Sequence, residues 1–90
     1  MPRLYLSYTL NAETQSVSPL TPASGEQFSL EELQAVVGGY IEIVALPKGM
    51  LLVCNEEGRL HQLPLNQPAS SLAGRQILGN VAIIHESQID

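Results

Sequence analysis

The chain of 90 residues has no tryptophan, one cysteine and only four cationic side chains. Cys54 cannot form an internal disulfide, so the sequence predicts a protein of a reducing compartment. Four cations against nine acids give a formal net charge of -5, which disfavours nucleic-acid binding because that depends on cationic contacts to phosphates. No segment approaches the about 20 apolar residues that cross a bilayer. We therefore expect a soluble, cytoplasmic protein that binds neither nucleic acid nor a membrane.

The residue patterns of common catalytic and metal sites are also missing. His61 and His85 stand alone, and with Cys54 they form no recognised metal-ligand spacing. The pair Gly38-Gly39 follows an expected helix, whereas a phosphate-binding loop precedes one. No serine lies in the context of a nucleophile elbow. We predict a non-enzymatic protein with no cofactor and no metal.

Length and hydrophobic content predict a single α+β domain over residues 1–90. Hydrophobic residues make up 44% of the chain, which is enough for one core. We expect an N-terminal strand or hairpin and loop over residues 1–28 and the core of the domain over residues 29–85. Residues 86–90 are expected to be a frayed tail.

The N-terminal part has the pattern of a strand followed by a short return strand. Alternating apolar residues predict a half-buried strand over Leu4–Leu10. Gln15–Leu20 is expected to return as an edge strand that ends near Pro19. Proline, serine and glycine in Thr21–Gln27 indicate a loop.

The sharpest local signal is a helix start at Ser29. Ser29 and Glu32 have the spacing of a capping box, and Phe28 and Leu33 that of a hydrophobic staple. Gly38 is expected to end the helix with a positive φ. The helix face that the spacing predicts to be apolar consists of Leu30, Leu33, Val36 and Val37.

After the helix, the sequence predicts three strands and a second helix. Strands are expected over Tyr40–Leu46, Met50–Cys54 and Arg59–Leu63. The first two are expected to pair through the turn Pro47–Gly49, and Asn55–Gly58 fits a type I turn.

The C-terminal part is expected to hold the second helix and a bent last strand. Asn66 or Gln67 could cap this short helix, with Pro68 in its first turn and Gly74 at its end. The last strand is expected over Ile77–Ile84.

These elements predict an α+β fold in which a small antiparallel sheet packs one face on the main helix. Tyr40, Val44 and Leu46 lie on the other face. Either the N-terminal hairpin and the short second helix cover that face, or a second subunit does. We favour a second subunit, and therefore a homodimer or another protein partner.

One polar cluster is a candidate for a small-ligand or peptide site, because mixed donors and acceptors beside an apolar sheet suit such a site. Its members are Tyr40, Glu42, Asn55, Arg59, His61 and Asn66. If the face that carries Glu42 is covered, its carboxylate needs a partner such as Arg59 or Arg75.

Four segments carry a resemblance to a known family. They are Val37–Val44, Asn55–Gly58, Leu63–Asn66 and Gly79–Val81. In order and spacing they resemble a small domain-of-unknown-function family of bacteria, phages and plasmids, with a Val-Gly-Gly-Tyr-Ile-Glu, Asn-Glu-Glu-Gly and Leu-Pro-x-Asn core. The resemblance covers residues 30–84, with Asn80 where the family often has aspartate. It supports the expected fold and compartment, implies no enzymatic activity, and is in keeping with a small accessory or host-interaction protein.

The sequence therefore predicts a non-enzymatic accessory or regulatory protein that acts through protein–protein interaction as a homo-oligomer. The alternative function is the binding or sequestering of a small molecule, such as a nucleotide-like metabolite.

Overall fold

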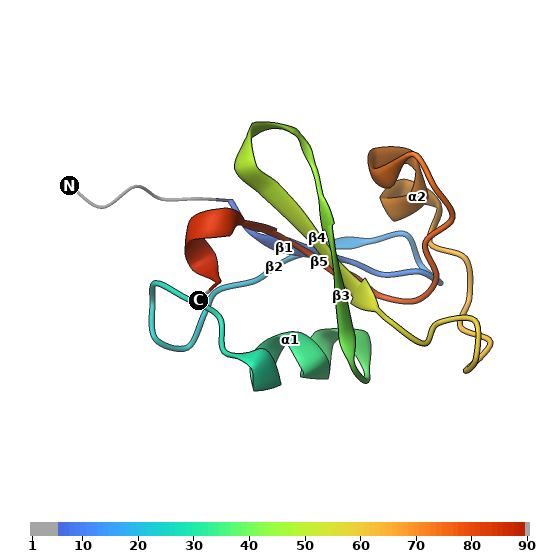
Figure 1. Ribbon diagram of the computed structural model, residues 1–90, viewed down its shortest axis with the longest axis horizontal. Helices are drawn as coiled ribbons and strands as arrows, with labels where there is room; N and C mark the ends of the chain where they lie inside the picture. The colour runs from blue at the N-terminus through green and yellow to red at the C-terminus, as the bar shows by residue number, and fades with distance from the viewer. Residues whose placement is uncertain (1–5, 90) are drawn as a thin grey trace.

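A computed structural model describes residues 6–89 and shows an α+β fold built on one antiparallel sheet (Figure 1). Its strands lie in the order β2-β1-β5-β4-β3. The strands are β1 (Tyr8–Leu10), β2 (Val17–Pro19), β3 (Ile41–Ala45), β4 (Met50–Asn55) and β5 (Val81–His85). The helices are α1 (Leu30–Val37) and α2 (Gln67–Ala73), with short 3-10 turns at Pro47–Gly49 and Glu86–Gln88. Helix α1 packs on the sheet, as the sequence predicted.

Alternation along the strands divides the core between the two faces of the sheet. On one face, Val53 of β4 and Ala82 of β5 pack with Phe28 and residues of α1. On the other face, Leu52 of β4 packs with residues of β1 and β5 and with Ala69 of α2. Successive side chains of a strand point to opposite faces, so β4 and β5 contribute to both layers. The short second helix therefore covers part of the face that the sequence left uncovered.

The predicted caps of α1 are confirmed. The backbone N–H of Glu32 donates to Ser29 Oγ at 3.2 Å, and the N–H of Ser29 donates to Glu32 Oε1 at 3.0 Å. Gly38 has a φ of 80°, and its N–H donates to the carbonyl oxygen of Gln34. These contacts satisfy backbone groups that a helix leaves unpaired at its ends. Along the predicted apolar face the side chains differ, because Leu33 is buried whereas Leu30 is exposed.

The predicted hairpin between β3 and β4 is also confirmed. The two strands pair antiparallel, with Ile43 opposite Val53. Lys48 and Gly49 both adopt positive φ in the connecting turn. At the other end of β4, the N–H of Gly58 donates to the carbonyl oxygen of Asn55, which closes the expected turn.

The prediction of a strand over Arg59–Leu63 is wrong. The backbone there forms consecutive turns, in which the N–H of His61 donates to Glu57 and that of Gln62 to Arg59. These local hydrogen bonds satisfy the backbone groups that a strand would offer to a neighbour. The segment therefore reverses direction at the end of β4.

The frayed tail expected over residues 86–90 is not observed for residues 86–89. Gln88 lies in a 3-10 turn and is buried, and its side chain accepts the N–H of His85 at 2.8 Å. Its carbonyl oxygen accepts the N–H of Phe28 at 2.6 Å. This hydrogen bond fixes the C-terminal segment to the backbone just before α1. Residue 90 lies outside the described residues.

The N-terminal strand is shorter than its alternation predicts. It begins at Tyr8, while Leu6 is irregular and exposed, and residues 4 and 5 of the prediction lie outside the described residues. The edge position predicted for the return strand is confirmed by β2. The last strand begins at Val81, and before it Leu78 forms an isolated bridge with Leu65.

Candidate functional site

Three of the six predicted site residues line one pocket, described below, and one of these three, Asn55, also has a structural role. Asn55 is buried, and its Nδ2 donates to the carbonyl oxygen of Val37 at 3.0 Å. Its Oδ1 accepts the N–H of Glu57 at 2.7 Å. The side chain thereby ties the end of α1 to the turn after β4.

Asn66 likewise has a structural role. Its side chain is fully buried and caps α2 by accepting the N–H of Ala69 at 3.1 Å. Nδ2 donates to the carbonyl oxygens of Leu10 and Gly79, at 3.0 and 2.9 Å. One side chain therefore joins the helix, β1 and the loop before β5, and no donor or cap oxygen is left facing solvent.

Tyr40 and His61 lie on the exposed surface. Tyr40 is 65% exposed, and its backbone carbonyl accepts the N–H of Glu56. His61 Nε2 lies 3.6 Å from Glu57 Oε1, four residues earlier in the turn. Neither residue is among the lining residues of the pocket that contains Glu42, Asn55 and Arg59.

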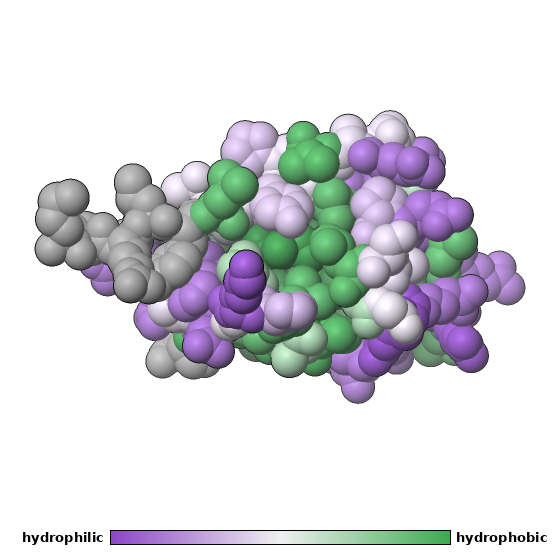
Figure 2. All heavy atoms as spheres, turned by 90° about the horizontal axis from the view of Figure 1, so that it is seen from above, coloured by the Kyte–Doolittle hydropathy of each residue, from purple (hydrophilic) through white to green (hydrophobic). Residues whose placement is uncertain are grey.

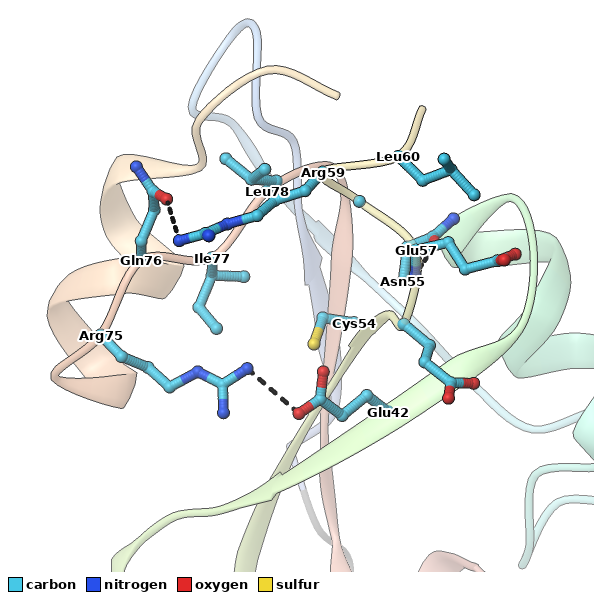
Figure 3. A pocket seen from close by; sticks show the side chains of 12 residues that line it. Glu42, Cys54, Asn55, Glu57, Arg59, Leu60, Arg75, Gln76, Ile77 and Leu78 are labelled. Atoms are coloured by element: carbon cyan, nitrogen blue, oxygen red, sulfur yellow. Dashed lines mark hydrogen bonds and ion pairs between the residues drawn. The ribbon is translucent and has the colours of Figure 1, made fainter. Parts of the chain in front are cut away.

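Glu42, Asn55 and Arg59 do come together, at a polar pocket of about 350 Å³ (Figure 3). Its walls come from β3, the end of β4, the turn after β4 and the segment that follows α2. Sequence reasoning missed Gln76 and Ile77 on that last wall. It named Arg75 only as a partner for Glu42, because nothing local shows that the chain returns here after Gly74.

Two side-chain bridges border this polar pocket. Arg75 Nη2 lies 3.1 Å from Glu42 Oε2, which confirms one of the two ion-pair partners predicted for Glu42. Arg59 Nη2 donates to Gln76 Oε1 at 3.3 Å. Figure 3 shows the two bridges on opposite sides, with Cys54 and Ile77 between them. The polar pocket therefore combines charged edges with an apolar floor.

Cys54 forms part of that floor and is buried, as predicted. Burial raises the pKa of its thiol, the carboxylate of Glu42 raises it further, and Arg75 acts in the opposite direction. A raised pKa keeps the thiol protonated near neutral pH, and a thiol is a weak nucleophile in that form.

In the described part of the chain, no group of three or more His, Cys, Asp or Glu side chains is placed to hold a metal ion. No helix within residues 6–89 is long and apolar enough to cross a membrane.

A second hollow, the apolar groove, lies between α2 and the strands β1 and β2. It has a volume of about 680 Å³, and none of its lining residues within the described residues 6–89 is charged. The lining residues are Leu6, Tyr8, Leu10, Val17, Pro19, Pro68, Ser71 and Leu72. Figure 2, which views the molecule from the side of α2, shows hydrophobic side chains gathered at the middle of this face.

The apolar groove is not the uncovered surface that the sequence indicated. Val44 and Leu46 are partly buried against the core cluster that contains Ala69 of α2. The strongly exposed apolar side chains of the groove are instead Leu6, Val17 and Leu72, at 78, 63 and 47%. They come from three separate segments, so no local pattern in the sequence could group them.

Comparison with protein families gives one match, to a domain of unknown function, DUF3846, over residues 12–89. Comparisons with curated proteins and with solved structures gave no match. The matched residues include strands β2 to β5, both helices and every wall of the polar pocket, whereas β1 precedes the match. The chain therefore belongs to the DUF3846 family.

Proposed function

We propose that this protein is a non-enzymatic accessory or regulatory protein that acts through protein–protein interaction at the apolar groove. We further propose that the bound polypeptide is a second copy of the same chain. The observation that carries the proposal is the groove itself, about 680 Å³ in volume and lined almost wholly by apolar side chains. Large exposed apolar surfaces of soluble proteins are typical of interaction sites.

Burial of the exposed apolar side chains supplies the driving force. Leu6, Val17 and Leu72 are each about half or more exposed in the isolated chain. Each square ångström of apolar surface removed from water contributes about 25 cal/mol. Association that covers these side chains is therefore favourable, provided that the partner presents a complementary apolar surface.

A second copy meets that requirement. In a two-fold symmetric dimer the same patch lies on both subunits, so an apolar groove faces an apolar groove. Each chain carries a formal net charge of -5, but the described lining residues of the groove place no like charges in contact, because none of them is charged. A 90-residue chain has a small core, and added burial between subunits would stabilise it.

The non-enzymatic part of the proposal is supported by the structural use of the polar side chains. Asn55 and Asn66, the two buried members of the predicted site, are held by backbone groups. The raised pKa of Cys54 disfavours the thiolate. We place the protein in the cytoplasm because its cysteine is free. We link it to phages or plasmids because of the resemblance of its sequence.

Concentration-dependent nuclear magnetic resonance spectra test this proposal. On dilution, the backbone amide signals of Val17, Ser71 and Leu72 are expected to shift as the two grooves separate. Signals of exposed residues on α1, such as Leu30, are expected to stay in place. A spectrum that does not change with concentration, from a chain that tumbles as a monomer, contradicts the second copy. Shifts confined to another surface contradict the groove.

A further inference from the structure

We propose that the polar pocket binds a small zwitterion of the amino-acid class, with its carboxylate at Arg59 and its ammonium group at Glu42. The pocket shares no lining residue with the apolar groove. The inference therefore does not depend on the proposed self-association.

The pocket is formed by backbone that is fixed by hydrogen bonds. On one side, the N–H of Leu63 donates to Gly58 and closes the turn that carries Arg59. On the other side, the N–H of Asn66 donates to the carbonyl oxygen of Ile77 at 2.9 Å. The two walls are thus positioned by the fold before any ligand arrives. Preorganised walls reduce the ordering cost of binding.

Arg59 provides the anion-binding edge. Its hydrogen bond goes to the neutral amide of Gln76, and within residues 6–89 no carboxylate lies at ion-pair distance from it. A guanidinium carries five N–H donors in a planar fork that matches a carboxylate. Arg59 can therefore keep Gln76 and still receive both oxygens of a carboxylate.

Glu42 provides the cation-binding edge. Its Oε2 contacts Arg75, while its Oε1 has no hydrogen bond within the described residues. Figure 3 places Glu42 and Arg75 on the side of the pocket opposite Arg59 and Gln76. A ligand that spans the pocket thus meets a positive group at one edge and a carboxylate at the other.

The overall charge of the lining favours a zwitterion over an anion. Two guanidinium groups and three carboxylates line the pocket, so a ligand with several negative charges, such as a nucleotide, would be repelled. A carboxylate without an ammonium group would leave Glu42 Oε1 without a hydrogen-bond donor. A ligand with one charge of each sign matches both edges without adding net charge.

The floor and volume set the size of the ligand. Cys54, Ile77 and Leu78 give an apolar surface between the two edges. The volume of about 350 Å³ is near the lower end of the usual range for small-molecule sites. An aliphatic amino acid has the charges, the apolar body and the size that this arrangement requires.

Titration with three related probes tests the inference. L-Leucine carries both charged groups, 4-methylpentanoate lacks the ammonium group, and 3-methylbutylamine lacks the carboxylate. In the 90-residue chain, L-leucine is expected to shift the amide signals of Cys54, Gly58 and Ile77. We expect each single-charge probe to bind at least about tenfold more weakly, because it loses one charged contact.

Two matched variants locate the binding. Arg59→Gln removes the anion-binding charge and is expected to weaken L-leucine binding about tenfold or more. Lys48→Gln makes the same charge change in the turn between β3 and β4 and is expected to leave binding unchanged. Equal binding of 4-methylpentanoate and L-leucine overturns the role of Glu42. Absence of any pocket shift with L-leucine at millimolar concentration, in protein whose spectrum is that of the folded chain, overturns the site.

Discussion

The side-chain amide of Asn55 donates a 3.0 Å hydrogen bond to the carbonyl oxygen of Val37, the last residue of α1. This contact joins the end of the helix to the end of β4, across 18 positions of the chain. Asn55→Ala is expected to lower the free energy of unfolding by about 2 kcal/mol, because it leaves buried backbone groups without partners. Urea denaturation measures the change.

His61→Ala is the matched control for Asn55. Both residues were assigned to the same site from sequence, but His61 is exposed. Its replacement is expected to change the free energy of unfolding by no more than about 0.5 kcal/mol. Equal losses in the two variants would contradict the structural role of Asn55.

Asn66 gives a second, pH-dependent prediction. Asn66→Asp keeps the oxygen that caps α2 but loses the donor that contacts Leu10 and Gly79. The buried carboxylate is expected to cost about 3 kcal/mol at neutral pH. Burial raises the pKa of such a carboxyl in the folded state, so part of the loss is expected to be recovered as the pH falls and the group becomes neutral.

Asn11→Asp is the control for Asn66. Asn11 accepts the N–H groups of Glu13 and Thr14 in an exposed turn and is not required as a donor there. Its conversion to aspartate is not expected to gain stability as the pH falls, because the two N–H donors favour the charged carboxylate. Urea denaturation at several pH values compares the two variants, and parallel profiles would contradict the burial argument.

Gly38 tests the backbone geometry at the end of α1. Its φ is 80°, and a Cβ built on it would meet no atom within 4 Å. Gly38→Ala is therefore expected to cost about 1 kcal/mol through backbone strain alone. Gly38→Asn should cost less, because asparagine tolerates the left-handed conformation better. Thermal unfolding that ranks alanine as the milder change would contradict this assignment.

The capping box predicts how stability depends on pH. Hydrogen bonds from the backbone of Ser29 and then of Ala23 lower the pKa of Glu32 below its ordinary value of 4.5. A lowered pKa in the folded state stabilises the fold above the pKa of the unfolded chain, and this contribution is lost as the pH falls through the folded value. The advantage of wild type over Glu32→Gln is expected to be present at pH 7 and to shrink below about pH 4.5. Glu31→Gln, in the same turn but outside the box, is the control. A difference that stays constant across this range would count against the charged contact.

The sequence predicted those features that depend on neighbouring residues. Ser29 and Glu32 cap the helix as their spacing indicates, and Gly38 ends it. The hairpin through Pro47–Gly49 was also predicted correctly, and Asn66 is one of the two caps that the sequence offered for α2. In each case the interacting groups lie within one turn or one hairpin, so a short segment determines the geometry.

The features that sequence reasoning missed depend on distant contacts. Asn66 donates to Leu10, 56 positions away, so its polar side chain could not be distinguished from a ligand-binding one. The carbonyl oxygen of Gln88 accepts the N–H of Phe28, and this contact orders residues 86–89, which were expected to be frayed. The segment after Gly58 has enough apolar residues for a strand, but local turn bonds take up its backbone groups.

The candidate site likewise combines residues that the sequence identified with features that depend on distant contacts. Glu42 and Arg59 were identified from sequence, and the ion pair of Glu42 with Arg75 was one of two predicted alternatives. The apolar groove was not found, because Leu6, Val17 and Leu72 approach each other only in the folded chain. Their grouping requires the order of strands in the sheet and the position of α2.

Sedimentation equilibrium of three proteins tests the central claim, that two copies associate through the apolar groove. Leu72→Glu places a charge in the groove, and Leu30→Glu places one at a similarly exposed position on α1, where the exposed fractions are 47 and 53%. Circular dichroism verifies that each variant is folded. We expect the average mass of wild type and Leu30→Glu to rise with concentration toward that of a dimer, while Leu72→Glu remains a monomer. A monomeric wild type at all concentrations, or a Leu72→Glu variant that associates as wild type does, would contradict it.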